Sequence, residues 1–228
     1  MSKLFICILA IVFSSCAVIS TSQFETAKTL GEGNGQIGFG GGFGRDVSSG
    51  IFLSSDVESF PSPIIEFYGQ TGVTPSIDAG IKMWIAGGGV GVKGSGKFQL
   101  SRDDAKFLFA FAPALSWTGS GTSTDVNGKS GHISATSVHL PLLWSTNTSK
   151  VFSLYGGFQY VYSHISLKDW DGNWKSFDHH SPGFTVGFQF KAGPVVFMPE
   201  CSFVFIHDFV SGLNFFVPFP NFGIGFNF

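Results

Sequence analysis

The chain has 228 residues, with 13 basic and 15 acidic side chains and a formal net charge of −2 at pH 7. This balance gives no support for a polyanion such as nucleic acid as a partner. Charged residues make up only 12% of the chain, whereas soluble domains carry about 25%, and Phe occurs 28 times and Gly 31 times. This composition argues against a water-facing exterior and indicates a sheet whose outer face meets lipid.

Residues 1–15 have the layout of a signal peptide, with a lysine near the start, about ten apolar residues and then small residues. The segment "FSSC", which ends at Cys16, resembles the bacterial lipobox, in which the cysteine is diacylated and becomes the mature N-terminus. We therefore expect cleavage before Cys16 and a lipid on its sulfur, with ordinary cleavage near residues 17–22 as the alternative. Residues 16–34 are then expected to form a periplasmic segment ahead of a barrel at 35–228. No later apolar run reaches about 18 residues, so no transmembrane helix is expected.

Ten segments follow in which apolar and polar residues alternate with the period of a β-strand. In "PIIEFYGQ", for example, Ile65 and Phe67 alternate with Glu66 and Tyr68. One face is bulky and apolar throughout, and the other carries Gly, Ala, Ser, Gln and a few charges. The segments are 36–43, 63–70, 76–85, 89–100, 105–117, 137–144, 152–163, 184–191, 195–205 and 222–228.

The polar face has too few charges to cover a water-exposed exterior, so the apolar face is expected to face lipid and the small polar face a lumen. Backbone groups in hydrocarbon must all be paired, so the sheet must close. We therefore predict an all-β fold, a closed antiparallel transmembrane β-barrel of about ten strands, with eight or twelve as alternatives. This fold predicts the bacterial outer membrane as its location.

The links between segments alternate between short and long, as periplasmic turns and external loops do. The long links include 118–132 and 166–181, which we expect to be external loops that present a ligand site. Aromatic residues near segment ends are expected in the interfacial girdles, namely Trp84, Trp117, Trp144, Tyr160 and Tyr162. Pro113, Pro141 and Pro199 fall inside expected strands, where each should mark a bulge or a shifted boundary.

The last strand carries Phe222, Ile224, Phe226 and Phe228 at every second position. This pattern resembles the C-terminal signal by which bacterial outer-membrane barrels are recognised for insertion. The stretch "TAKTLGEGNGQIGFGGG", with "PIIEFYGQTGVTPSIDAGIKM" and "GVGVKGSGKFQL", resembles small outer-membrane barrel lipoproteins that carry an Ala-Arg-Thr-Leu-Gly-Lys-Gly-like stretch before the first strand. The resemblance covers about residues 16–100. It implies an outer-membrane barrel with the assembly machinery, membrane lipids and lipopolysaccharide as partners, and no assigned activity.

Charged residues on the expected lumenal face form a candidate cluster. Because buried charges need partners, we expect ion pairs among those of neighbouring strands. The cluster either fills a structural interior, which we favour, or lines a narrow passage for small solutes. Its members are Glu66, Asp78, Lys82, Lys93, Lys97, Lys191 and Glu200.

The spacing of His164, Ser166 and Asp178 resembles the catalytic residues of the outer-membrane lipid A deacylase. A serine nucleophile needs a base, and the base needs an orienting carboxylate. Asp178 stands where that enzyme has Glu, and Leu167 where it has Asn, so we keep the deacylase as the alternative and expect no enzyme. No cofactor or metal motif occurs, since the glycine runs lack a phosphate-loop ending and the cysteines lack metal-ligand spacing. The expected role is structural or interaction-based, with narrow passive solute passage.

Overall fold

The computed structural model describes residues 17–46, 61–87, 89–120, 123–124, 130–147, 149–168, 171–207 and 214–228. Cys16 and the expected signal peptide, residues 1–15, lie outside this part of the chain. The strands are β1 (Val18–Ile19), β2 (Gly35–Asp46), β3 (Pro61–Thr74), β4 (Ile77–Ala86), β5 (Gly89–Gln99), β6 (Phe107–Phe111), β7 (Ala114–Ser120), β8 (Ser123–Thr124), β9 (Ser130–Thr146), β10 (Phe152–Lys168), β11 (Trp174–Ala192), β12 (Val195–His207) and β13 (Asn214–Asn227). Over these residues, no helix is long and apolar enough to cross a bilayer.

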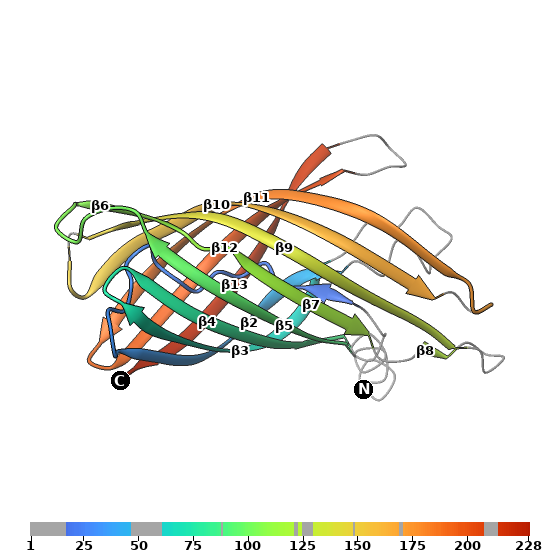
Figure 1. Ribbon diagram of the computed structural model, residues 1–228, viewed down its shortest axis with the longest axis horizontal. Coiled ribbons are helices and arrows are strands. Elements are labelled where there is room, and N and C mark those ends of the chain that lie inside the picture. The colour runs from blue at the N-terminus through green and yellow to red at the C-terminus, as the bar shows by residue number, and fades with distance from the viewer. Residues whose placement is uncertain are drawn as a thin grey trace, which may run out of the picture.

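The sheet closes into a barrel in which every strand is antiparallel to its neighbours (Figure 1). The first and last wall strands, β2 and β13, pair from Gln36 opposite Asn227 to Gly42 opposite Asn221. The main-chain groups of Gly35 and Phe228 add two hydrogen bonds, of 2.9 and 3.0 Å. Because β6 and β7 are two halves of one wall strand, the barrel has ten strands, as predicted.

Proline breaks the wall in one place and weakens it in another. Pro113 has no N–H to donate, and it separates β6 from β7, although both halves keep one register with β5 and β9. Pro199 lies where the β11–β12 ladder is interrupted, between the pairs Gly187–Glu200 and Phe190–Phe197. Pro141 stays inside an unbroken β9. A lipid-facing sheet thus tolerates proline at positions where one hydrogen bond between neighbouring strands is missing.

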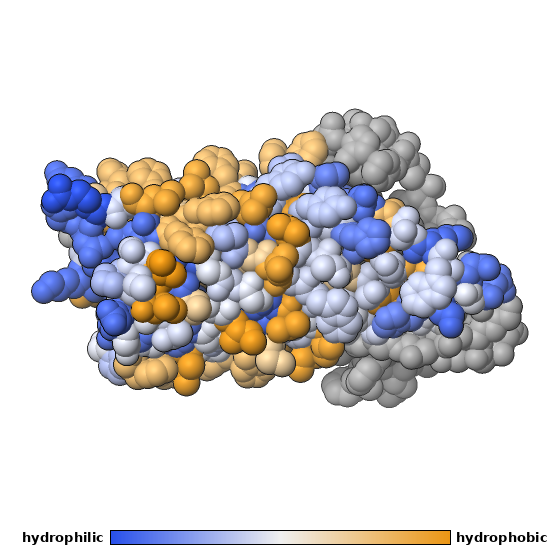
Figure 2. Space-filling model, viewed as in Figure 1, coloured by the Kyte–Doolittle hydropathy of each residue, from blue (hydrophilic) through white to orange (hydrophobic). Residues whose placement is uncertain are grey.

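The two faces of the wall alternate as the sequence predicts. In β3, Ile65 is 60% exposed and Phe67 55%, whereas Glu66 between them is fully buried. Apolar side chains gather over the barrel body, with hydrophilic ones at the end where the short turns lie (Figure 2). An apolar outer surface on a closed sheet is what hydrocarbon requires. The chain is therefore an outer-membrane β-barrel.

The two ends of the barrel differ. Short turns join β3 to β4 and β11 to β12 at the end where the C-terminus lies, at the left of Figure 1, and this is the periplasmic end. At the other, outer end, β9, β10 and β11 run beyond the barrel wall. The pairing of β10 with β11 continues to Lys168 opposite Trp174. Residues 166–181 are therefore mostly hairpin strand rather than the loop we predicted, because β10 and β11 continue to pair above the membrane.

Residues 17–30 lie inside the barrel, and we call this segment the plug. It starts at the outer end, where β1 pairs with β2, and runs through the lumen to the periplasmic end before β2 begins (Figure 1). We predicted a periplasmic segment here, and that placement is wrong. The reason is that a polar lumen accepts a polar segment, whose Ser, Thr and Gln side chains and backbone are satisfied by the wall.

Candidate functional site

The outer part of the plug is held by apolar contacts and strand pairing. Val18 and Ile19 pair with Asp46 and Arg45 of β2. Trp84 donates a hydrogen bond of 2.7 Å from its indole Nε1 to the carbonyl of Val18. Trp84 is therefore in the lumen and not in an interfacial girdle. It belongs to the even-numbered, inward face of β4, which also carries Lys82.

In the middle of the lumen, Glu66 of β3 binds the plug. The hydroxyls of Ser20 and Ser22 both donate to its carboxylate. Lys82 of β4 lies 3.7 Å from the same carboxylate, and its ammonium group donates to the Ser22 carbonyl at 2.9 Å and hydroxyl at 2.7 Å. The Glu66–Lys82 ion pair of the wall thus uses its remaining hydrogen-bond donors and acceptors to bind the plug. Buried charges need such partners.

Glu200 of β12 makes the second anchor, with β13 and β2 lying between β12 and β3 in the wall. Its carboxylate accepts the main-chain N–H groups of Gln23 at 2.7 Å and Phe24 at 2.9 Å, and the hydroxyl of Tyr155 at 2.9 Å. Phe24 has a backbone φ of 50°, which is unfavourable for a bulky residue. The two N–H bonds to one carboxylate hold this conformation in place.

The ring of Phe24 occupies space that glycine provides. A Cβ atom on Gly40 would come within 2.5 Å of this ring, and one on Gly223 within 3.0 Å. The two glycines are paired across the β2–β13 closure. Gly40 and Gly223 therefore make room for the aromatic ring of the plug.

Asp78 of β4 fixes the periplasmic part of the plug. Its two carboxylate oxygens lie 3.1 Å from the main-chain nitrogen of Leu30, and Lys97 of β5 lies 2.9 Å from one of them. Lys97 also donates to the carbonyl of Lys28 at 2.9 Å. Glu25 of the plug is 4.0 Å from the same ammonium group.

The structure thus brings five of the seven cluster residues into contact with the plug. Lys93 is buried opposite Lys82 in the β4–β5 register, and Lys191 lies at the periplasmic end, beside a cavity. The partner of this cluster is the plug itself, which was not predicted. The hydroxyl and amide side chains between Ser20 and Thr26 gave no signal, because they resemble those of a linker.

A second group of polar residues lies on the outside of the wall, above the apolar band. His164 of β10 is directly opposite Asp178 of β11, and its Nδ1 is 2.8 Å from the Asp178 carboxylate. This bond to His164, followed by a bond from Tyr162, lowers the pKa of Asp178 below its usual value. Ser166 is on the same face of β10, two residues from His164. The histidine–carboxylate pair of the alternative catalytic triad is therefore assembled, on an exposed surface.

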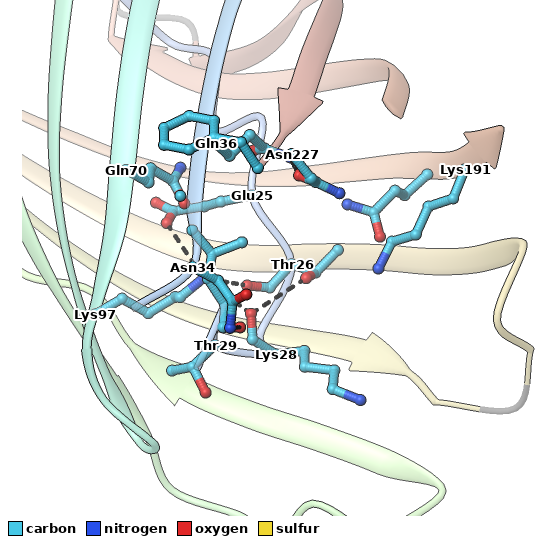
Figure 3. Close-up of a pocket in the computed structure, with 14 residues that line it drawn as sticks. Glu25, Thr26, Lys28, Thr29, Asn34, Gln36, Gln70, Lys97, Lys191 and Asn227 are labelled. Atoms are coloured by element: carbon cyan, nitrogen blue, oxygen red, sulfur yellow. Dashed lines mark hydrogen bonds and ion pairs between the residues drawn. The ribbon is translucent and has the colours of Figure 1, made fainter. Parts of the chain in front are cut away.

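Two adjoining polar cavities open beside the plug at the periplasmic end. One has a volume of about 380 Å³ and the other about 450 Å³. Figure 3 shows the first, with Lys97 of the wall on one side and Lys28 and Lys191 on the other. Both cavities are bordered by Thr26 and Gln189. In the described ranges, no three His, Cys, Asp or Glu side chains are placed to hold a metal ion.

The C-terminal aromatic row lies on the outer face of β13, with Phe222, Phe226 and Phe228 exposed and Ile224 partly exposed. The side chains of this row are therefore accessible to lipid, and to any assembly factor that binds β13 before the barrel closes. Residues 118–120, 123–124 and 130–132 are the described part of the other expected external loop, and β8 pairs there with β9.

No protein-family model and no curated protein sequence matches the chain. Solved structures with a similar course include the outer-membrane protease OmpT from Escherichia coli, 11% identical over 92% of this chain and 100% of that chain, with a TM-score of 0.49. Another is Ail, the attachment invasion locus protein of Yersinia pestis, in complex with the heparin analogue sucrose octasulfate, 15% identical over 86% and 99%, with a TM-score of 0.44. The translocator domain of the autotransporter NalP from Neisseria meningitidis is 10% identical over 87% and 89%, with a TM-score of 0.36. Because these identities and TM-scores are low, the architecture and the location rest on the chain's own strand pairing and apolar surface.

Proposed function

We propose that the protein is a plugged outer-membrane barrel with a structural and interaction role, in which the wall holds its own N-terminal segment and presents the β9–β11 sheet outside the membrane. The plug fills the lumen as a continuous chain from Val18 to Leu30, and three carboxylates of the wall bind it. A free passage for solutes requires that these bonds break first. Narrow passive conduction is therefore a property of a displaced plug and not of the resting barrel.

The observation that carries this proposal is the pair of main-chain bonds from Gln23 and Phe24 to Glu200. A plug that is bound only through its side chains would have a backbone that is free to move. A carboxylate that accepts hydrogen bonds from two successive main-chain N–H groups fixes the backbone itself. The surfaces left for partners are then outside the lumen. Trp174 is 64% exposed at the tip of the β10–β11 hairpin, where an aromatic side chain can contact lipopolysaccharide, a glycan or another protein.

Single-channel recording of detergent-refolded protein in a planar bilayer tests this proposal. We expect silence from inserted wild-type protein and discrete current steps from Glu200→Ala, whose plug loses two main-chain hydrogen bonds to the wall. Glu200→Gln, which keeps an acceptor oxygen, serves as the matched control and should open less often. Steady conductance by the wild type at the level of the alanine variant contradicts a plugged barrel.

A second candidate function, lipid A deacylation, is favoured by one observation, the 2.8 Å bond between His164 and Asp178. This pair supplies the base and its orienting group, and Ser166 on the same face supplies the hydroxyl. The group faces outward above the apolar band, where lipid A head groups lie. Mass spectrometry of lipid A from cells that express the wild type, His164→Ala or Ser166→Ala decides the matter, because identical acylation in all three excludes the enzyme.

We also propose that Cys16 carries a lipid after signal cleavage and that the row from Phe222 to Phe228 serves recognition by the barrel-assembly machinery. The lipobox-like "FSSC" and the outward aromatic row support these two roles. Intact-mass measurement of the mature protein tests the first, since Cys16→Ser should remove the mass of the acyl groups. Insertion yield of Phe228→Ser tests the second.

A further inference from the structure

The cavity of about 450 Å³ beside the plug has a lining that differs from the rest of the lumen. It lies between the periplasmic part of the plug and the ends of β9, β10 and β11, and all of its lining residues are polar. Its size is within the range of about 300–1,000 Å³ that small-molecule sites occupy. The adjoining cavity of about 380 Å³ differs from it, because Glu25 and the apolar side chains of Leu30 and Phe228 also line that cavity.

Three lysines border this cavity, Lys28 from the plug, Lys150 from the β9–β10 turn and Lys191 from β11, and no acidic residue does. Over the described ranges, no carboxylate lies within ion-pair distance of these three ammonium groups, in contrast to Lys82 and Lys97. Lys28 and Lys191 lie on the side of the plug away from Lys97 (Figure 3). Three like charges around one small volume repel each other and favour a counter-ion.

A buried hydroxyl in the same cavity has no partner. Ser145 of β9 is 1% exposed, borders the cavity, and its Oγ makes no hydrogen bond with the described residues. A buried hydroxyl without a partner is costly, so such groups are usually satisfied by a ligand or by water. The side-chain amide of Gln189 borders the cavity as well and offers both a donor and an acceptor.

We propose that this cavity is a binding site for a small, hydroxyl-rich anion that carries a phosphate or carboxylate group and enters from the periplasm. The lysines neutralise the anionic group as point charges, as lysine does in phosphate sites. The hydroxyl of Ser145 donates to it, and Gln189 and Thr26 bind the hydroxyls of the ligand. Because Lys28 and Thr26 belong to the plug, the bound anion also ties the periplasmic end of the plug to the wall.

Isothermal titration calorimetry of the full refolded chain tests this site, with glucose 6-phosphate, gluconate, inorganic phosphate and uncharged glucose as probes. We expect the anionic sugars to bind more tightly than glucose, with an affinity that falls as salt is added. The preference between glucose 6-phosphate and gluconate separates phosphate from carboxylate recognition, and weaker binding of inorganic phosphate shows that the hydroxyls contribute.

Lys191→Gln and Lys28→Gln should each weaken binding roughly tenfold, and Ser145→Ala by a smaller factor. Lys175→Gln is the matched control, because it removes the same charge at the opposite, outer end and should leave binding unchanged. Heat-dependent migration on a gel verifies that each variant is folded, and Ser145→Ala keeps the test valid if a lysine variant is not. Equal binding of glucose and its phosphate, or equal loss in Lys175→Gln and Lys191→Gln, overturns the proposal.

Discussion

The outer and periplasmic ends of the lumen hold the same plug by different means. At the outer end, Val18 and Ile19 are paired with β2 and packed among apolar side chains, and the side chains of Trp84 and Thr118 both donate to the Val18 carbonyl. At the periplasmic end, Asp78 and Lys97 bind the backbone of the plug, and open polar cavities lie beside it. Among the described residues, the plug is packed against the wall at the outer end and borders open polar space at the periplasmic end.

The largest expected effect is at the periplasmic end. Asp78→Ala removes the partner of Lys97 and the acceptor for Leu30 N–H, and breaking a buried ion pair costs about 3–5 kcal/mol. Reversible unfolding in urea with lipid vesicles measures the free energy of unfolding. Asp104→Ala is the control, because its pair with Arg102 is exposed, and such pairs contribute about 0–1 kcal/mol. Equal losses in the two variants would mean that the plug does not depend on Asp78.

A smaller loss is expected at the outer end. Trp84→Phe removes one of the two side-chain donors to the Val18 carbonyl, and Thr118 still donates to it at 3.1 Å. The expected cost is therefore that of one hydrogen bond, about 0.5–1.5 kcal/mol. The apolar packing around the ring is largely kept, so the plug should stay in place and the barrel should remain silent in bilayer recordings. Trp117→Phe, on the lipid-facing side of β7, is the matched control. If Trp84→Phe conducts, the seal at this end depends on one hydrogen bond rather than on packing.

The smallest effect concerns the outer-face pair, which lies outside both ends of the lumen. The pKa of Asp178 is lowered in the folded protein by His164 and Tyr162. The stabilisation from this pair is therefore fully present above the ordinary value of 3.8, and it is lost as the pH falls through the lower folded value. A carbon NMR titration of the Asp178 carboxyl group should show a midpoint below 3.8, and His164→Ala should raise it. A midpoint that is the same in both proteins contradicts the bond.

Strand order, closure and the lipid-facing rows follow from the period-two pattern, because one face must be apolar in hydrocarbon and the other must not. Trp84 shows how this rule should be used. Its even number places it with Asp78 and Lys82 on the lumenal face of β4, and that parity is a better guide than the usual preference of tryptophan for the interface. The course of β10 and β11 above the membrane was not predicted, because the alternation is reversed there. The polar side chain of His164 is on the outer face, and Ile165 and Leu167 are buried on the inner face.

One part of the candidate site, the charged residues of the wall, was predicted from the sequence, and the other part, the plug, was not. The wall charges Glu66, Asp78 and Glu200 are evident as acids on a face that cannot meet water freely. Their partner was not evident, because the plug has no strand or helix period and its polar side chains resemble those of a linker. Contacts separated by more than a hundred residues, such as Gln23 with Glu200, leave no local trace in either segment.

The closing ladder between β2 and β13 has a consequence for how the barrel is made. The plug and β2 are consecutive in the chain, and β2 forms one side of the final seam. The segment must already be inside when that seam forms, or it must be drawn in lengthwise afterwards, since a closed wall offers no sideways entry. In the first case the plug acts as a template around which β3, β4 and β12 gather, and the last strand encloses a core that is already in place.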